Sequence, residues 1–504
     1  YFSYVKDFKG GHNLNATAGY SYFEVNGENF GMDNYNFSVD GIKYWDIGQG
    51  SYLTDGKAGM SSGKSVTERL FSFFARANYS YQDKYMLSAS IRHEGSSKFA
   101  ADNRWANFWS ATAGWRISNE EFMKDFDWLD ALKIRFGYGV TGNNDFSATY
   151  MANMLGSDTN WMMPNGTWAY SYGKSQNVNP NLGWEEKKEW NLGVDYSFFE
   201  GRLYGKFDYY RREVDNLLFS VKVPQPPYTQ GSQMQNIGSM ESKGWEFEVG
   251  GDIIRTKDFT WSSSMNLSHN TGKILTLEGD NSYHNGNGFV APGTPGDAAR
   301  MEAGSTIGSF YMWKFAGFDD EGSFLLYNKD GEVIPAAQKT ENDKQYIGNY
   351  TPKLIIGWSH TLTYKNFDLG INLRSWIDFD VYNTINMYYG IQGQGNLNVL
   401  KDAYGKFNHI KGEKQICDYF LEDGTVLKID AITLGYTLPM KMYTNNLIDR
   451  IRIYGTVGNV CTITGYSGMN PEVDITGWDK GTEKFWSDFY PVVRTWTLGM
   501  QFNF

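Results

Sequence analysis

Hydrophobic and polar residues alternate with a period of two over many short stretches of this chain. In residues 494–504, every second position carries a large apolar side chain: Trp496, Leu498, Met500, Phe502 and Phe504. This period is typical of a β-strand with one apolar and one polar face. The stretch is also long enough for a tilted strand that crosses a bilayer, which needs about 9–11 residues.

The same pattern predicts about fifteen strands along the chain. They are expected at residues 1–8, 12–25, 70–81, 85–92, 108–117, 132–139, 184–198, 202–217, 245–254, 259–269, 354–364, 367–376, 426–438, 451–460 and 492–504. Because these strands span the whole chain, the sequence predicts an all-β protein.

The predicted connections alternate between short and long. The short ones are residues 9–11, 82–84, 200–201 and 365–366, and the long ones end near Lys64, Gly183, Tyr350, Gly424 and Tyr490. Short periplasmic turns that alternate with long outer loops are typical of a transmembrane antiparallel β-barrel. The connections therefore favour a barrel that spans a membrane.

Residues 367–374 illustrate how such a strand would lie in the membrane. One alternate set is expected to face lipid: Phe367, Leu369, Ile371 and Leu373. The set between them is expected to face a wet lumen: Asp368, Gly370, Asn372 and Arg374. A soluble β-sandwich, whose apolar face points inward, would show the same alternation. The strand number, the unequal loops and the terminal Phe504 favour the barrel over the sandwich.

An odd number of strands is unexpected for a barrel of this kind. Bacterial single-chain barrels have an even number of strands, and an open sheet cannot leave bare edges in lipid. We therefore expect the first strands of the barrel to lie outside this sequence.

Composition and charge narrow the function classes. The net charge of −11 argues against a nucleic-acid partner, and aromatic residues make up 17% of the chain, as expected for strands with interfacial aromatic girdles. No stretch approaches the ~18 apolar residues of a membrane helix. The two cysteines, Cys417 and Cys461, form either a single disulfide or two free thiols. Trp115 and Trp496 are expected in the girdles.

Short motifs along the whole chain resemble those of SusC/RagA-type TonB-dependent transporters. They include residues 78–85, 88–92, 95–99, 114–118, 138–144, 179–185, 208–210, 307–311, 346–353, 433–439, 458–459 and 466–472. Each motif is loose by itself, and the resemblance rests on their number and order.

The resemblance implies a 22-stranded barrel with a plugged lumen, of which residues 1–504 are the carboxy-terminal portion. It implies energy from TonB-ExbB-ExbD, location in the outer membrane of a Gram-negative bacterium, and a SusD-like surface lipoprotein that caps the barrel. The amino-terminal plug, the TonB box and the early strands of the family have no counterpart in this sequence.

The leading functional hypothesis is TonB-dependent import of a nutrient, an oligosaccharide by preference. An oligopeptide importer of the same family is the nearest alternative, and a siderophore or cobalamin receptor comes next. A soluble carbohydrate-binding or glycan-degrading β-protein is the alternative of another class. Because we find no catalytic constellation or metal-ligand spacing among the histidines, we expect neither an enzyme nor a cofactor.

Aromatic residues in the long connections are the candidate contacts for substrate or lid: Trp161, Trp168, Tyr170, Tyr172, Tyr388, Tyr389, Trp478 and Trp486. The loops expected to carry this contact run from Gly142 to Gly183 and from Phe379 to Gly424, and simple packing of the rings is the alternative. Phe504 is the candidate signal for barrel assembly. Asn328, Asp330 and Glu332 form an incomplete calcium-loop pattern, which leaves a structural Ca²⁺ as an open alternative.

Overall fold

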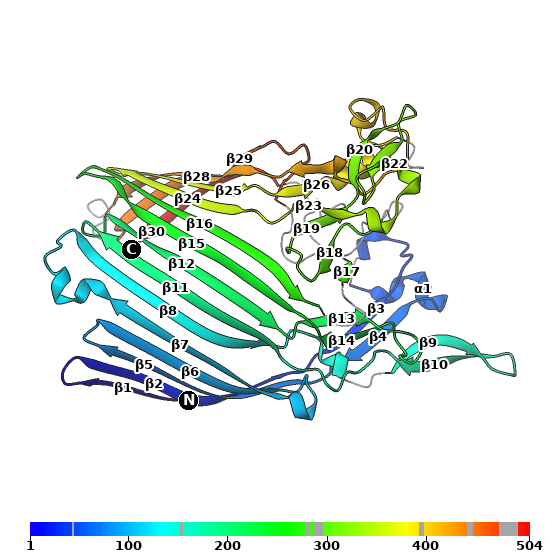
Figure 1. Cartoon of the computed structure of the whole chain (residues 1–504), viewed down its shortest axis with the longest axis horizontal. Coiled ribbons are helices and arrows are strands. Elements are labelled where there is room, and N and C mark those ends of the chain that lie inside the picture. The colour runs from blue at the N-terminus through cyan, green and yellow to red at the C-terminus, as the bar shows by residue number, and fades with distance from the viewer. Residues whose placement is uncertain are drawn as a thin grey trace.

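A computed structural model gives the fold, and it describes residues 1–42, 45–151, 155–277, 283–285, 296–392, 398–440, 447–472 and 492–504. One antiparallel sheet of 15 strands dominates it, and each strand pairs with the next in the order β1-β2-β5-β6-β7-β8-β11-β12-β15-β16-β24-β25-β28-β29-β30. The sheet curls into the wall of a barrel, with both chain termini on this wall (Figure 1).

The strands of this wall are β1 (Phe2–Phe8), β2 (His12–Val25), β5 (Glu68–Tyr81), β6 (Tyr85–Ser96), β7 (Trp105–Arg116), β8 (Leu129–Asn143), β11 (Glu185–Phe198), β12 (Leu203–Asp215), β15 (Ser239–Arg255), β16 (Phe259–Thr276), β24 (Leu354–Tyr364), β25 (Phe367–Ile377), β28 (Val426–Pro439), β29 (Arg450–Thr464) and β30 (Thr495–Asn503). Each contains or overlaps one predicted strand, so the prediction of about fifteen strands is confirmed. Several are longer than predicted, above all β8, β15 and β16.

The long connections were predicted as loops, and this was wrong for much of their length. They contain β3 (Glu28–Asp33), η1 (Asp40–Ile42), η2 (Ile47–Gln49), α1 (Ser51–Thr54), β4 (Gly59–Lys64), η3 (Ala101–Asn103), η6 (Ala148–Met151), β9 (Leu155–Met162), β10 (Trp168–Lys174), β13 (Leu218–Lys222), β14 (Ser232–Asn236), β17 (Tyr283–Asn285), β18 (Arg300–Glu302), β19 (Ser309–Met312), β20 (Lys314–Phe318), β21 (Phe324–Tyr327), β22 (Val333–Pro335), η7 (Ala336–Gln338), η8 (Glu341–Asp343), β23 (Gln345–Asn349), β26 (Asp380–Tyr382), α2 (Thr384–Tyr389), η9 (Lys401–Tyr404), η10 (Asp418–Phe420) and β27 (Leu421–Asp423). At the opposite end, η4 (Ile117–Asn119) and η5 (Glu121–Met123) join β7 to β8.

Paired charges identify the polar face of the sheet. Arg135 on β8 donates two hydrogen bonds to Asp195 on β11, at 2.9 and 2.8 Å, and a third to Asp208 on β12 at 3.2 Å. In the same way, Arg452 on β29 donates to Asp368 on β25 at 2.9 Å. These charges pair across adjacent strands or across one intervening strand, as expected for a face that lines an aqueous lumen.

The opposite face is apolar and uncovered. Along β30, Trp496 and Leu498 expose 77% and 83% of their surface. Apolar side chains this exposed would be unfavourable in water, and they fit a face that lies against lipid. Of the described helices, none is both long and apolar enough to cross a membrane.

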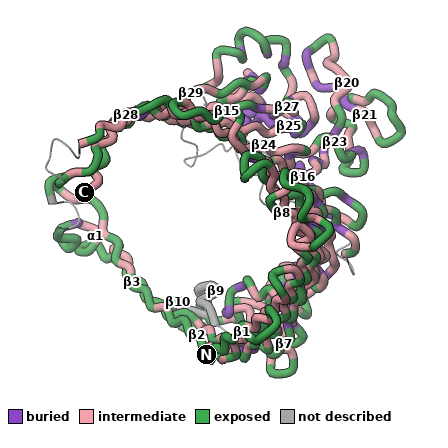
Figure 2. Tube along the Cα trace, turned by 90° about the vertical axis from the view of Figure 1, so that its left-hand side faces the viewer, coloured by how far each residue is buried: buried purple, intermediate pink, exposed green. Residues whose placement is uncertain are grey.

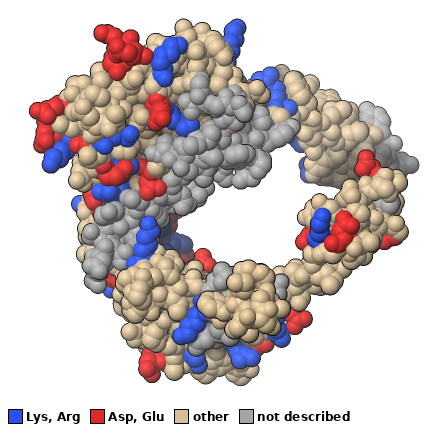
Figure 3. Space-filling view, turned by 90° about the vertical axis from the view of Figure 1, so that its right-hand side faces the viewer, with Lys and Arg blue, Asp and Glu red and all other residues tan. Residues whose placement is uncertain are grey.

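Most buried residues lie outside the sheet. In Figure 2 the buried positions gather around β20, β21, β23 and β27, whereas the wall is largely of intermediate or exposed residues. Viewed from the end that carries the long connections, the molecule surrounds an open hollow (Figure 3). The protein thus consists of a barrel wall and a separately packed group of long connections.

Gly244 on β15 lies in close contact with both neighbouring strands, β12 and β16. Gly244 pairs with Tyr210, whose ring folds over the glycine, and a Cβ on Gly244 would overlap the carbonyl oxygen of His269. Only glycine therefore permits this close approach of strands.

The two cysteines are both free thiols, which decides between the two alternatives left by the sequence.

Candidate functional site

The described parts of the long connections extend from one end of the barrel, on the right of Figure 1. Three parts of this end are described below. The first is the rim corner, where β5 begins and β6 and β8 end. The second is the loop lobe, formed by the described parts of residues 296–350 and 379–423. The third is the β9–β10 hairpin.

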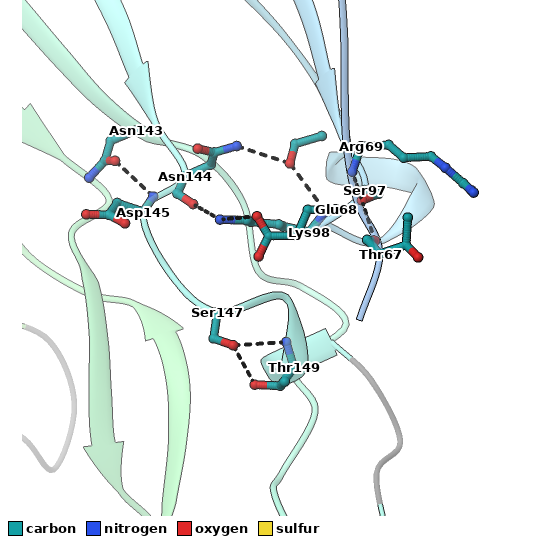
Figure 4. Close-up of polar contacts among 11 residues, drawn as sticks. Thr67, Glu68, Arg69, Ser97, Lys98, Asn143, Asn144, Asp145, Ser147 and Thr149 are labelled. Carbon is teal, nitrogen blue, oxygen red and sulfur yellow. Dashed lines mark hydrogen bonds and ion pairs between the residues drawn. The ribbon is translucent and has the colours of Figure 1, made fainter. Parts of the chain in front are cut away.

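Lys98 is the centre of the rim corner. Its Nζ lies 3.2 Å from a carboxylate oxygen of Glu68 and donates to the backbone oxygen of Asn144 at 3.3 Å (Figure 4). Only 14% of the lysine side chain is exposed. The lysine is therefore held between the start of β5 and the connection after β8.

Hydroxyl and amide groups extend this network. The Asn144 side-chain amide donates to Ser96 Oγ at 3.1 Å, and Ser97 Oγ accepts from the backbone N–H of Arg69 at 2.8 Å (Figure 4). Asn143 donates to Glu185, the first residue of β11, at 2.9 Å. Hydrogen bonds and one ion pair thus join the ends of four strands, β5, β6, β8 and β11.

Aromatic rings pack beneath these bonds. The buried members of this cluster are Phe99, Phe108, Phe146, Leu182 and Trp184. The Phe99 and Trp184 ring centroids are 4.9 Å apart, and Trp184 donates its indole N–H to the carbonyl of Arg104 at 3.1 Å. The motifs at residues 95–99, 138–144 and 179–185 therefore meet in one place, where they hold the rim together.

The loop lobe has a hydrophobic core of its own. Sixteen buried residues form it, among them Phe310, Met312, Trp313 and Phe324. Lys344 lies 4.3 Å and Lys339 lies 4.9 Å from the Trp313 ring, and burial lowers the pKa of Lys339. A core of this size makes the lobe a fixed body rather than a free loop.

Two further motifs meet within the lobe. The motif at residues 346–353 meets the one at 307–311, because Tyr350 donates its backbone N–H to the carbonyl of Gly308 at 2.9 Å. The backbone N–H of Asn349 donates to Asp380 at 2.8 Å, and burial raises the pKa of that carboxyl group.

Tyr388 and Tyr389, predicted as contact residues, belong to this lobe. Tyr388 is only 1% exposed and is part of the core, and burial raises its pKa. Tyr389 packs against the same core and is partly buried. Helix α2 turns the Tyr388 ring into this core, and the contact of these two tyrosines with substrate or lid stays a prediction.

The predicted calcium loop is a hairpin turn between β21 and β22. Asn328 Oδ1 accepts from the backbone N–H groups of Asp330 and Glu332, at 3.0 and 2.8 Å. Its amide donates to the Glu332 carboxylate at 3.1 Å. These groups stabilise the turn instead of converging on an ion, and within the described residues no cluster of three or more His, Cys, Asp or Glu side chains could hold a metal.

The β9–β10 hairpin carries exposed aromatic rings. Trp161, Trp168 and Tyr172 expose 66%, 66% and 68% of their surface. Trp168 pairs with Met162, and Trp161 pairs with Ala169, so the two indoles lie on opposite faces of the hairpin. The side chain of Tyr170, and the whole of Trp478 and Trp486, lie outside the described residues.

A second hairpin with exposed apolar residues was missed by the sequence analysis. In the β3–β4 hairpin, Phe30 and Met60 expose 83% and 86% of their surface, and Met60 pairs with Met32. The signal that the sequence offered was a few apolar residues inside a loop rich in glycine and asparagine.

Phe504, the candidate assembly signal, follows β30 directly and is 86% exposed.

Comparison with known families gives a clear match. Residues 1–383 match the family model described as TonB dependent receptor-like, beta-barrel. The TonB-dependent receptor SusC of Bacteroides thetaiotaomicron is 31% identical over 470 residues, which cover 89% of this chain and 45% of that protein. The TonB-dependent receptor P3 of Formosa agariphila is 30% identical, over 100% of this chain and 52% of that protein.

Solved structures agree with this match. A structure of the RagAB peptide transporter superposes with a TM-score of 0.82 at 25% identity, over 99% of this chain and 54% of that chain. This chain spans about half the length of the curated relatives it matches. These relatives are named receptors and transporters, which agrees with the prediction that the chain is not an enzyme. The chain belongs to the TonB-dependent receptor family of outer-membrane β-barrels, and within it to the SusC/RagA type.

Proposed function

We propose that the protein containing this chain imports an oligosaccharide across the outer membrane, with energy from TonB-ExbB-ExbD and together with a SusD-like lipoprotein. The chain forms part of the barrel wall and the outer face at which the nutrient is captured. Support for the family partners comes from the similarity to SusC over 89% of this chain.

The observation that carries the oligosaccharide proposal is the pair of uncovered indoles on the β9–β10 hairpin. Trp161 and Trp168 are each 66% exposed at the end with the long connections. Flat aromatic faces stack on the apolar faces of sugar rings, and they also suit contact with a lipoprotein lid. Stacking on sugar rings suits the capture of a neutral ligand rather than an ion.

An oligopeptide is the second candidate. It is favoured by the RagAB peptide transporter, whose structure superposes with this chain at a TM-score of 0.82. Main-chain amides of a peptide would need polar partners on the lumen wall, and such partners exist there, for example Asn78 and Thr112.

Binding to the purified full-length protein and its lipoprotein partner distinguishes these candidates. We expect isothermal titration calorimetry to detect binding of oligosaccharides and not of mixed oligopeptides. Changing Trp161 and Trp168 to Ala together should weaken oligosaccharide binding by about tenfold, equivalent to about 1.4 kcal/mol.

A matched control is Trp128→Ala. Trp128 is also exposed, at 48%, but it follows η5 at the end with the short turns. This variant should bind as the unchanged protein does. Peptide binding without oligosaccharide binding would replace the first candidate by the second, and equal losses in both variants would refute a role for the hairpin.

A further inference from the structure

A groove lies on the outer wall of the barrel, near the end with the short turns. It measures about 530 Å³, and its lining includes Leu203, Val249, Gly251, Met265 and Trp358. This volume lies within the range of about 300–1,000 Å³ that is common for small-molecule sites. The groove is distant from the long connections, so it belongs to none of the three parts described above.

Strand pairing places the groove on the face that meets lipid. Val249 pairs with Met265, Met265 with Trp358, and Trp358 with Leu373. Directly paired residues lie on the same face of a sheet. Since Leu373 belongs to the apolar outer set, the whole row faces the membrane.

Gly251 forms the floor of the groove, and the groove is deep here because glycine has no side chain. This residue pairs with Leu203 and with Ser263, and a Cβ on Gly251 would overlap the carbonyl oxygen of Arg202. A side chain cannot be placed there without moving the backbone. The depression is therefore built into the contact between β12 and β15.

The walls of the groove are fixed as well. Trp358 donates its indole N–H to Ser263 Oγ at 2.8 Å, which holds the ring beside the glycine floor. On the other side, a bulge between Asp252 and Ile254 turns Ile253 outward, where 53% of its surface is exposed. The result is an apolar channel with rigid sides.

Charged groups of both signs lie where the channel reaches the short turns. Arg202 lines the groove and is exposed. Asp252 also lines it and lies 3.7 Å from Arg255 at the end of β15, which pairs with this carboxylate. Arginine forms bidentate hydrogen bonds with phosphate. A largely apolar channel with the exposed Arg202 at its end is complementary to a molecule with a hydrocarbon chain and a phosphate head.

We propose that this groove binds a phospholipid of the inner leaflet of the outer membrane. One acyl chain lies in the channel between Leu203 and Trp358, and the phosphate is bound by Arg202. The short turns of such barrels face the periplasm, so the leaflet beside the groove is the one that contains glycerophospholipid. The proposal depends on the outer-membrane location and not on the nutrient that is imported.

Native mass spectrometry of the purified full-length protein tests the acyl-chain site. The protein is mixed with phosphatidylethanolamine, and bound lipid is counted as the detergent concentration rises. Val249→Trp fills the channel and should reduce retained lipid by about tenfold. The control is Val194→Trp on β11, which pairs with Phe207 on the outer face beyond the groove and should keep the lipid. Equal retention by the two variants would overturn the proposal.

The phosphate contact is tested separately with diacylglycerol of the same chain length. The unchanged protein should retain phosphatidylethanolamine better than diacylglycerol, and Arg202→Gln should remove that difference. A preference that survives in Arg202→Gln would show that this arginine does not bind the phosphate. Heat-modifiable migration on gels serves as the folding check for each variant, and a variant that fails it is replaced by Val249→Phe or Arg202→Asn.

Discussion

Single side chains decide which face of a strand can meet lipid. On β25, Ile371 belongs to the apolar set, and its neighbour Asn372 belongs to the set that contains the paired Asp368. Placing Arg at position 371 should cost about 2–4 kcal/mol of unfolding free energy at the bilayer midplane, because the charge must enter hydrocarbon. Arg at position 372 should cost less, since it enters the lumen.

Unfolding of both variants by urea in lipid vesicles gives this comparison. Equal losses of unfolding free energy at positions 371 and 372 would contradict the assignment of the two faces.

Asp343 stabilises the loop lobe at the start of a short helix. Its carboxylate accepts from the backbone N–H and the hydroxyl of Thr340, both at 2.7 Å, and from the backbone N–H of Lys329 at 3.0 Å. We expect Asp343→Ala to destabilise the lobe by about 1–2 kcal/mol, the usual range for a lost cap. Faster hydrogen exchange at residues 340–345, with no change in β24, would be the measured result.

The same carboxylate gives a pH dependence. Hydrogen bonds from Lys329 and Thr340 lower the pKa of Asp343 in the folded protein. Its contribution to stability is therefore present above its ordinary pKa of about 3.9 and is lost as the pH falls through the lower folded value. At neutral pH, we expect hydrogen exchange in the lobe to be faster in Asp343→Ala than in the unchanged protein. At strongly acidic pH, we expect the two proteins to exchange equally fast. A constant difference at all pH values would argue against this role.

At the level of elements, glycines at close strand contacts should be far more sensitive than glycines elsewhere in the sheet. Gly244 on β15 faces the Tyr210 ring and the carbonyl of His269, whereas an added Cβ on Gly370 of β25 would meet nothing within 4 Å. Gly244→Ala should lose about 1–3 kcal/mol through overpacking. Gly370→Ala should be close to neutral, and urea unfolding of the two variants measures the difference. Similar stabilities would show that β15 can move away from Tyr210 on β12 and His269 on β16 without cost.

The strands of the wall could be predicted from the sequence, and the loop lobe could not. Strand β2 was predicted at 12–25 and β24 at 354–364, and both have these bounds in the structure. The reason is that alternation is local and each strand lies between lipid and lumen along its whole length. Burial in the lobe depends instead on contacts between distant segments, such as Phe310 with Tyr382.

The same distinction explains the outcome for the candidate site. Trp161, Trp168, Tyr388 and Tyr389 looked equivalent in sequence, because all are aromatic residues in long connections. Only the fold separates the exposed hairpin from helix α2, whose Tyr388 is buried. The motifs at 95–99 and 138–144 could be recognised from the sequence, but their role in joining the rim depends on the hydrogen bond between Asn144 and Ser96.

For the molecule as a whole, assembly of the barrel should depend on its terminal strand. The outer set of β30 ends with Phe502 and the exposed Phe504. Deleting Phe504 from the full-length protein should reduce its level in the outer membrane far more than Asn503→Ser does. Immunoblots of outer-membrane fractions measure this, and normal levels after the deletion would refute the assignment of Phe504 as an assembly signal.

Uptake by living cells tests the central proposal most directly. Cells that express the full-length protein and its lipoprotein partner would be given a fluorescent oligosaccharide, with and without a functional TonB system. We expect uptake to require both the protein and TonB, and to fall about tenfold when Trp161 and Trp168 are changed to Ala. Uptake that is equally fast in cells lacking the protein, or that continues without TonB, would contradict the proposal that this barrel is an energised importer.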